Sequence, residues 1–209
     1  MDRVNGYNIY IGRLVHSWCF FERTHALFAL RNQDALKQAN ITHVISVVGP
    51  KERPSAISSL QTYDVQGHLI LDLLDQDQEN ILQHFPQANR FIEGATADGS
   101  AVLVHWSGQY LFPYIYTIET PEHLHMHINS DPELYSGLGI SRSATIVLAY
   151  MLYQARPRLT PGGALFVLRS SRPGCQPNAG FTEQLALYHQ MGCPDSLEDQ
   201  HLYQLFLDR

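Results

Sequence analysis

The chain contains 209 residues, 44% of them hydrophobic and 16% charged, which suits one globular domain with a hydrophobic core. Its formal net charge is −6, so the composition does not favour a nucleic-acid-binding protein. No apolar run is long enough to span a bilayer, and the N-terminus has no signal-peptide pattern. We therefore expect a protein of the cytoplasm, the nucleus or both, with no membrane partner.

Strands are predicted at four places in the first half of the chain. Residues 7–12 alternate in polarity, and residues 41–48 form a β-branched run that two prolines end. Residues 68–72 and 101–105 are further short runs of strand-forming residues. The run over 101–105, Ala-Val-Leu-Val-His, is apolar enough to predict a buried central strand.

Helices are predicted between and after these strands. Residues 80–97 carry an apolar stripe at helical spacing, which Pro86 interrupts, and residues 143–154 are apolar all round, which predicts a central buried helix. Strands interleaved with helices predict an α/β domain with a central mixed sheet packed by helices. The other predicted helices cover residues 26–30 with 34–39, the segment from Thr160-Pro161 towards Arg169, and residues 181–191.

A glycine-rich turn precedes the helix over residues 143–154. Consecutive backbone N–H groups in such a turn, together with a helix N-terminus, form an anion cradle, and a planar guanidinium can hold two oxygens of a phosphate. The sequence thus indicates a phosphate-binding loop, although glycine before a helix is also ordinary turn chemistry. The loop residues are Gly137, Leu138, Gly139, Ile140, Ser141 and Arg142, followed by Ser143.

The strand that ends at His105 and this loop together resemble the signature loop of the cysteine-dependent protein phosphatases. That signature consists of a strand, His-Cys, two residues, Gly, two residues, Arg and Ser or Thr. Here the first half stops at Trp106 and the second half resumes at Gly137, and the segment between the halves contains no cysteine.

Codon arithmetic offers an explanation for the split signature. Trp is encoded only by TGG. Suppose that Ser107 has a TCN codon and that Ser136 has an AGC or AGT codon. The stretch from the last G of the Trp106 codon through the AG of the Ser136 codon then starts with GT and ends with AG, as introns do. Its removal keeps the reading frame and leaves a Cys codon between His105 and Gly137. We interpret residues 107–136 as a retained intron or a gene-model error, and a genuine insertion in a degenerate phosphatase is the competing interpretation.

The resemblance to the dual-specificity protein phosphatases extends over most of the chain. It rests on the stretch Ile41–Val47, the phosphate loop, Arg172-Pro173 and the segment Pro177-Asn178…Phe181…Gln184-Leu185. The tail around Met191–Asp195 is similar to an atypical fungal subtype that normally continues into a C-terminal zinc-binding domain. We expect a phosphatase domain over 1–195 with insertions at 13–25 and 107–136, then a short tail over 196–209 without the zinc domain.

The resemblance implies a metal-free hydrolysis of phosphotyrosine and phosphoserine or phosphothreonine in proteins. A cysteine thiolate is the expected nucleophile, at the Trp106/Ser136 junction, with Arg142 on the phosphate oxygens and Ser143 on the sulfur. The expected general acid is Asp75, which stands 31 residues before position 106, with Asp72 and Asp77 as alternatives. His105 is expected to order the loop. Without the cysteine, the alternative is a pseudophosphatase that binds phosphoproteins without hydrolysing them.

The remaining cysteines and histidines give no disulfide, cofactor or metal pattern. Cys19, Cys175 and Cys193 are odd in number and far apart, which is typical of reduced thiols in an intracellular protein, and none has the signature loop after it. The run His123–His127 contains three histidines, but it lies inside the suspected insertion. We therefore predict neither a metal site nor a cofactor.

Overall fold

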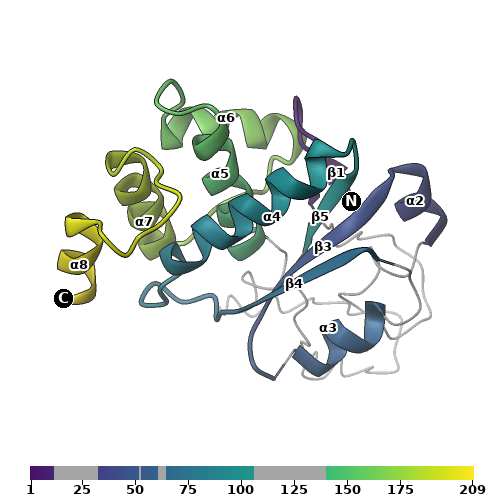
Figure 1. The fold of residues 1–209 in the computed structure, drawn as a ribbon, viewed down its shortest axis with the longest axis horizontal. Coiled ribbons are helices and arrows are strands. Elements are labelled where there is room, and N and C mark those ends of the chain that lie inside the picture. Colours follow the sequence, from purple (N-terminus) through teal and green to yellow (C-terminus); the bar gives the residue numbers. More distant parts are fainter. Residues whose placement is uncertain (12–32, 52, 61–64, 106–139) are drawn as a thin grey trace, which may run out of the picture.

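The computed structural model describes residues 1–11, 33–51, 53–60, 65–105 and 140–209 (Figure 1). These residues include one five-stranded sheet with the strand order β1-β2-β5-β3-β4. β1 runs antiparallel to β2 and the other neighbours run parallel, so the sheet is mixed, as predicted. The strands are β1 (Asp2–Arg3), β2 (Ile9–Ile11), β3 (Ile41–Val48), β4 (Gly67–Asp72) and β5 (Ala101–His105).

The central strand β5 is apolar up to its last residue, His105, because both faces of the sheet are covered. On one face Val102 and Val104 join the main hydrophobic core, and α4 (Phe85–Ala97) and α5 (Arg142–Gln154) pack against this strand. On the other face Leu103 joins a smaller cluster with Leu36 of α2 (Gln33–Gln38). The predicted strand 101–105 and the predicted central helix therefore lie side by side, as expected.

The helix α5 occupies the middle of the helical layer. Every residue of α5 from Arg142 to Tyr153 is buried, which accounts for its apolar sequence on all sides. The helices α6 (Pro161–Ser171) and α7 (Ala179–Gln190) both pack against it, and α8 (His201–Leu207) lies beyond α7 in Figure 1. The other helical segments are α3 (Arg53–Leu60) and the 3-10 helix η1 (Leu82–His84).

Local capping sets the helix boundaries. Thr160 caps α6 by accepting a hydrogen bond from the Gly163 N–H at 3.2 Å. Pro86 lies in the first turn of α4, where its missing N–H costs no helical hydrogen bond, so the stripe predicted over 80–97 divides into η1 and α4. The helix predicted over 181–191 begins two residues earlier because Asn178 caps it.

Three elements differ from the sequence-based expectation. β1 and α3 were not predicted, and the tail over 196–209 contains α8, whose Tyr203 and Phe206 pack against the main core. The suspected insertions at 13–25 and 107–136 lie outside the described residues. Among the helices that the structure describes, none has the length and apolar character needed to cross a membrane.

Candidate functional site

The site lies beyond the carboxyl ends of the parallel strands, where α5 begins. Ser141 is the N-cap residue of α5 and Arg142 is its first residue. The Ser141 carbonyl accepts hydrogen bonds from the Thr145 N–H and from the Thr145 hydroxyl, both at 2.8 Å, which fixes the first turn. The helix start therefore holds the Arg142 side chain, only 4% exposed, at the end of the sheet.

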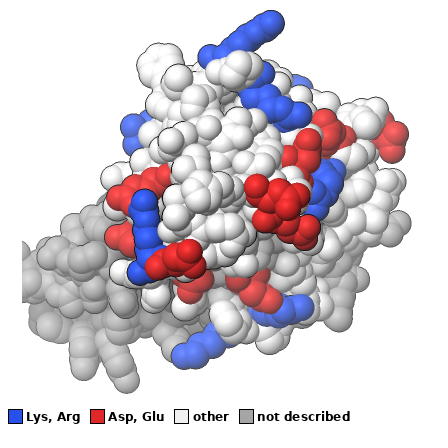
Figure 2. All heavy atoms as spheres, turned by 60° about the vertical axis from the view of Figure 1, so that its left-hand side comes forward, with Lys and Arg blue, Asp and Glu red and all other residues white. Residues whose placement is uncertain are grey.

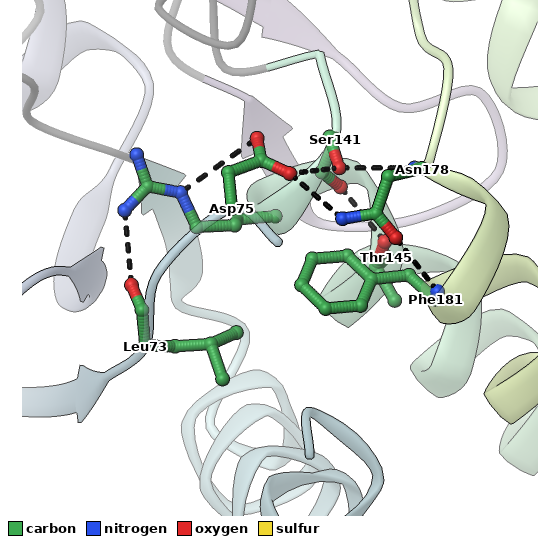
Figure 3. Close-up of polar contacts among 7 residues, drawn as sticks. Leu73, Asp75, Ser141, Thr145, Asn178 and Phe181 are labelled. Atoms are coloured by element: carbon green, nitrogen blue, oxygen red, sulfur yellow. Dashed lines mark hydrogen bonds and ion pairs between the residues drawn. The ribbon is translucent and has the colours of Figure 1, made fainter. Parts of the chain in front are cut away.

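Asp75 meets this helix start from the loop that follows β4 (Figure 3). Its Oδ1 accepts hydrogen bonds from the Ser141 hydroxyl at 2.7 Å and from the Asn178 side-chain amide at 3.0 Å. Its Oδ2 lies 3.9 Å from Nε of Arg142, and the Asp75 side chain is 6% exposed. The carboxylate expected to act as the general acid is thus buried against the arginine expected to bind phosphate.

Arg142 is also anchored to the end of β4. Its Nη1 donates a hydrogen bond to the Leu73 carbonyl at 3.0 Å. A guanidinium has five N–H donors in one plane, a geometry that suits it to bind the oxygens of a phosphate. The arginine is therefore oriented by the same segment that carries Asp75.

The two alternative acids lie in different surroundings. Asp72 forms an ion pair with Arg53, and both side chains are at least 42% exposed, so this carboxylate faces solvent. Asp77 contacts the N-terminus of α7, where its Oδ1 accepts a hydrogen bond from the Gly180 N–H at 3.4 Å. Of the three acids, Asp75 is the one whose contacts reach Ser141 and Arg142.

Ser143 is fully buried in the first turn of α5. Among the described residues, its hydroxyl has no hydrogen-bond partner. A buried hydroxyl without a partner is costly, so this position favours a polar group next to it.

His105 is held in the sheet by a chain of side chains from neighbouring strands. Its Nε2 lies 2.7 Å from the Ser46 hydroxyl, which in turn lies 2.8 Å from Nε2 of His68. His105 is 2% exposed, and burial lowers the pKa of His68 below its usual value. These contacts fix the His105 ring, and its role in ordering the loop stays a prediction.

Asn178 is a site residue to which sequence reasoning gave no role. Its Oδ1 accepts a hydrogen bond from the Phe181 N–H at 2.8 Å, its side-chain amide donates to Asp75, and its own N–H donates to the Ser141 hydroxyl at 3.1 Å. The signal in the sequence was an N-cap asparagine after a proline. That signal predicts a helix start, but it does not predict a contact with a carboxylate 103 positions away.

The described cysteines are unsuited to nucleophilic chemistry. Cys175 and Cys193 are buried, and burial raises the pKa of each thiol to about 11. Both are therefore neutral thiols near neutral pH. Within the described ranges no group of three or more His, Cys, Asp or Glu residues could hold a metal ion.

Several residues that were weighed as site candidates, whether kept or rejected, fall outside the described residues. These are the loop residues Gly137, Leu138 and Gly139, Trp106 with the junction at Ser136, the run His123–His127, and Cys19.

Comparison with known proteins points to one group of enzymes. No protein-family model matches the chain. Dual specificity protein phosphatase 19 of Mus musculus is 28% identical over 160 residues, 77% of this chain and 55% of that protein. Tyrosine-protein phosphatase YVH1 of Saccharomyces cerevisiae is 28% identical over 158 residues, 73% of this chain and 37% of that protein. The chain thus spans less than two thirds of the length of these relatives.

Solved structures with the same fold include a phosphatase domain and a phosphatase-like protein. The Yvh1 phosphatase domain from Chaetomium thermophilum has a TM-score of 0.59 at 24% identity and covers 93% of this chain and 98% of its own. The human tyrosine phosphatase-like serine/threonine/tyrosine-interacting protein has a TM-score of 0.57 at 25% identity, and the match covers 78% of this chain and 86% of that protein's chain. The chain has the α/β phosphatase fold, and its homologues are protein-tyrosine and dual-specificity phosphatases.

Proposed function

We propose that this sequence encodes a dual-specificity protein phosphatase whose active form lacks residues 107–136. We call that form the rejoined chain. In it, His105 is followed by a cysteine and then by Gly137, and Arg142 stands six residues after the cysteine. The observation that carries the proposal is the buried cluster of Asp75, Ser141 and Arg142 at the start of α5. The substrate class is phosphotyrosine and phosphoserine or phosphothreonine in proteins.

The first chemical step is transfer of the phosphoryl group to sulfur. The cysteine thiolate attacks phosphorus while the bond from phosphorus to the ester oxygen breaks, giving a phosphocysteine. The loop N–H groups, the N-terminus of α5 and Arg142 stabilise the charge on the equatorial oxygens and lower the pKa of the thiol. Asp75 gives its proton to the departing phenolate or alkoxide, so the first product leaves as a neutral alcohol.

The second step returns the enzyme to its starting state. Water attacks the phosphocysteine, and the Asp75 carboxylate takes a proton from that water. The bond from phosphorus to sulfur breaks, inorganic phosphate is released and the thiolate is restored. Ser143, a fully buried hydroxyl in the first turn of α5, donates a hydrogen bond to the sulfur and makes it a better leaving group.

Residues 107–136 are proposed to be a retained intron or a gene-model error. Support comes from the codon pattern described above, in which one excision gives intron boundaries, an intact frame and a cysteine at the right spacing. Sequencing the transcript across codons 100–145 tests this proposal. A message that lacks the piece supports it, and uniform retention of the piece contradicts it.

The subtype and the location of the protein are also proposals. The tail Met191–Asp195 and the similarity to the yeast YVH1 phosphatase support a Yvh1-type subtype. The widely spaced cysteines support a reducing compartment, the cytoplasm or the nucleus. Microscopy of a fluorescent fusion tests the location, and a secreted or membrane-enclosed signal would contradict it.

The alternative function applies if residues 107–136 are translated. The full chain has no cysteine at the signature position, so its phosphate site has no nucleophile and can only bind. The resemblance to a solved protein described as phosphatase-like and as an interacting protein favours this second candidate. Calorimetric titration of the full chain with a phosphotyrosine peptide, against the unphosphorylated peptide, tests binding without hydrolysis.

Activity assays on two chains test the main proposal. The rejoined chain is made by changing Trp106→Cys and deleting residues 107–136. We expect it to hydrolyse aryl phosphates, while the full chain shows no measurable hydrolysis because it lacks the thiolate. A rejoined chain without the cysteine, carrying Ser at the junction, is the matched control. Equal rates for the full and rejoined chains would place the activity at a different site.

A further inference from the structure

The helix α7 contacts both ends of the loop that carries Asp75. We define the acid loop as residues 73–81, which connect β4 to η1. At its start, Asp75 accepts a hydrogen bond from Asn178, the N-cap of α7. Beyond its end, the Leu82 N–H donates to Oε1 of Gln184 at 3.0 Å. Hydrogen bonds therefore connect the acid loop and the residue that follows it to α7 and its N-cap at two points.

The middle of the acid loop also lies against α7. The Gln184 amide donates to the Glu79 carbonyl at 2.8 Å, and Gln184 is 2% exposed. Gly180 lies so close to the loop that a Cβ on it would be 1.9 Å from the Asp77 carbonyl oxygen. The N-terminal turns of α7 thus determine where the acid loop can lie.

Asn178 uses each end of its side-chain amide for a different task. The oxygen accepts the Phe181 N–H and caps the helix, while the nitrogen donates to Oδ1 of Asp75. Ser141 donates to the same Oδ1, so this oxygen accepts two hydrogen bonds. Two donors on Oδ1 disfavour a proton there, which places the proton of the neutral acid on Oδ2.

The other carboxylate oxygen is the one that faces the phosphate site. Oδ2 of Asp75 is buried, lies 3.9 Å from Nε of Arg142, and has no hydrogen-bond partner among the described residues. A proton on Oδ2 therefore points to the region where Arg142 would hold a phosphate ester and its leaving oxygen.

We propose that Asn178 is a positioning residue for Asp75, which keeps the catalytic proton on Oδ2 and the acid loop against the phosphate site. This inference rests on the proposed phosphatase function and adds a residue to its mechanism. Because Asn178 acts through Asp75, its effect should depend on how much help the leaving group needs from an acid.

The kinetic test compares leaving groups in the rejoined chain. Asn178→Ser keeps an N-cap residue, because Ser caps as well as Asn, but its shorter side chain does not reach Asp75. We expect kcat for phenyl phosphate, a poor leaving group, to fall about tenfold or more, and kcat for p-nitrophenyl phosphate to fall less than about threefold. KM should stay within about twofold for both substrates.

Two matched variants separate this role from a general loss of stability. Thr160→Ala removes the cap of α6, a hydrogen bond between Thr160 and Gly163 at the start of that helix, and should leave the ratio of the two rates unchanged. In an Asp75→Asn background, Asn178→Ser should have no further effect on phenyl phosphate, because the two residues act as a unit. The same loss in both backgrounds, or an equal loss for both substrates, would overturn the proposal.

A second measurement does not depend on activity. In the full chain, Asn178→Ser should speed amide hydrogen exchange in residues 75–79 about tenfold relative to Thr160→Ala. An unchanged exchange rate overturns the positioning role even if the rejoined chain is active. If the rejoined chain is inactive, that result contradicts the proposed phosphatase function. The hydrogen-exchange measurement still decides whether Asn178 holds the acid loop.

Discussion

The surroundings of the three candidate acids favour the one that the sequence had ranked first by its spacing. Asp72, Asp75 and Asp77 lie within one short acidic stretch, and spacing alone ranked them. In the structure only Asp75 among them is tied to Ser141 and lies beside Arg142, while Asp72 pairs with Arg53 at the surface. A carboxylate that is buried next to the arginine proposed to bind phosphate is suited to exchange a proton with a bound ester.

Removing the proton donor from Asp75 tests its role at the residue scale. In the rejoined chain, Asp75→Asn should slow turnover of phenyl phosphate by about two to four orders of magnitude, because an amide donates no acidic proton to the leaving oxygen. Steady-state kinetics over a range of pH measures the change. Asp72→Asn is the matched control and should change the rate less than about threefold. A larger effect of Asp72→Asn than of Asp75→Asn would assign the acid to Asp72.

The buried thiols lead to a prediction about reactivity. Raising a thiol pKa from 9.0 to about 11 lowers the thiolate fraction near pH 8 about a hundredfold, and the thiolate is the reactive form. In a Cys19→Ser background, Cys175 and Cys193 should react with iodoacetamide at pH 8 at least about a hundredfold more slowly than in denaturant. Mass spectrometry of the labelled chain measures both rates. Fast labelling of the folded chain would contradict the burial of these thiols.

The same two thiols predict a loss of stability at high pH. A thiol whose pKa is raised in the folded state stays protonated there while the unfolded chain ionises. The free energy of unfolding should therefore be unaffected by these groups below about pH 9 and should fall as the pH rises from about 9 to about 11. Denaturant unfolding across this range measures the slope, and Cys175→Ala with Cys193→Ala should flatten it.

At the scale of secondary-structure elements, the sequence predicted best those strands and helices that are buried on several sides. The ranges of β3 and β5 match the prediction, and α5 begins one residue early, because burial on all sides gives long apolar runs. α3 and α8 have a weaker apolar periodicity, and α8 has no buried residue. The two residues of β1 form a strand through their pairing with β2. Such elements depend on contacts that local periodicity does not encode.

Part of the candidate site was predictable for the same reason. The spacing around Arg142 and the position of Asp75 are local features of the sequence, and both pointed to residues that the structure brings together. The link between Asp75 and Asn178 joins residues 103 positions apart, and only the folded chain places them in contact.

The close approach of α7 to the acid loop can be tested by adding one methyl group. Gly180→Ala should lower the free energy of unfolding by about 1–3 kcal/mol, because the new Cβ would overlap the Asp77 main chain. The matched control is Gly162→Ala in α6, whose Cβ would meet nothing within 4 Å and which should be neutral or stabilising by up to about 1 kcal/mol. Denaturant unfolding measures both, and equal effects would contradict the close contact.

At the scale of the whole molecule, the parallel strands of the mixed sheet bring the site residues together at one edge. The carboxyl ends of β3, β4 and β5 lie together, so the acid loop, His105 and the start of α5 meet there although they are far apart in the sequence. Acidic and basic side chains are interspersed on the face shown in Figure 2, which agrees with a modest net charge and no extended basic field on that face.

The strand order also has a consequence for the growing chain. β2 pairs with β5, not with the next strand in sequence, and its partners Val102–Val104 follow it by about ninety residues. While the ribosome has yet to add those residues, Ile9–Ile11 has an unpaired edge that can join other strands. Such a distant pairing is slow to form, so the N-terminal strand should dock late and depend on protection from aggregation until β5 emerges.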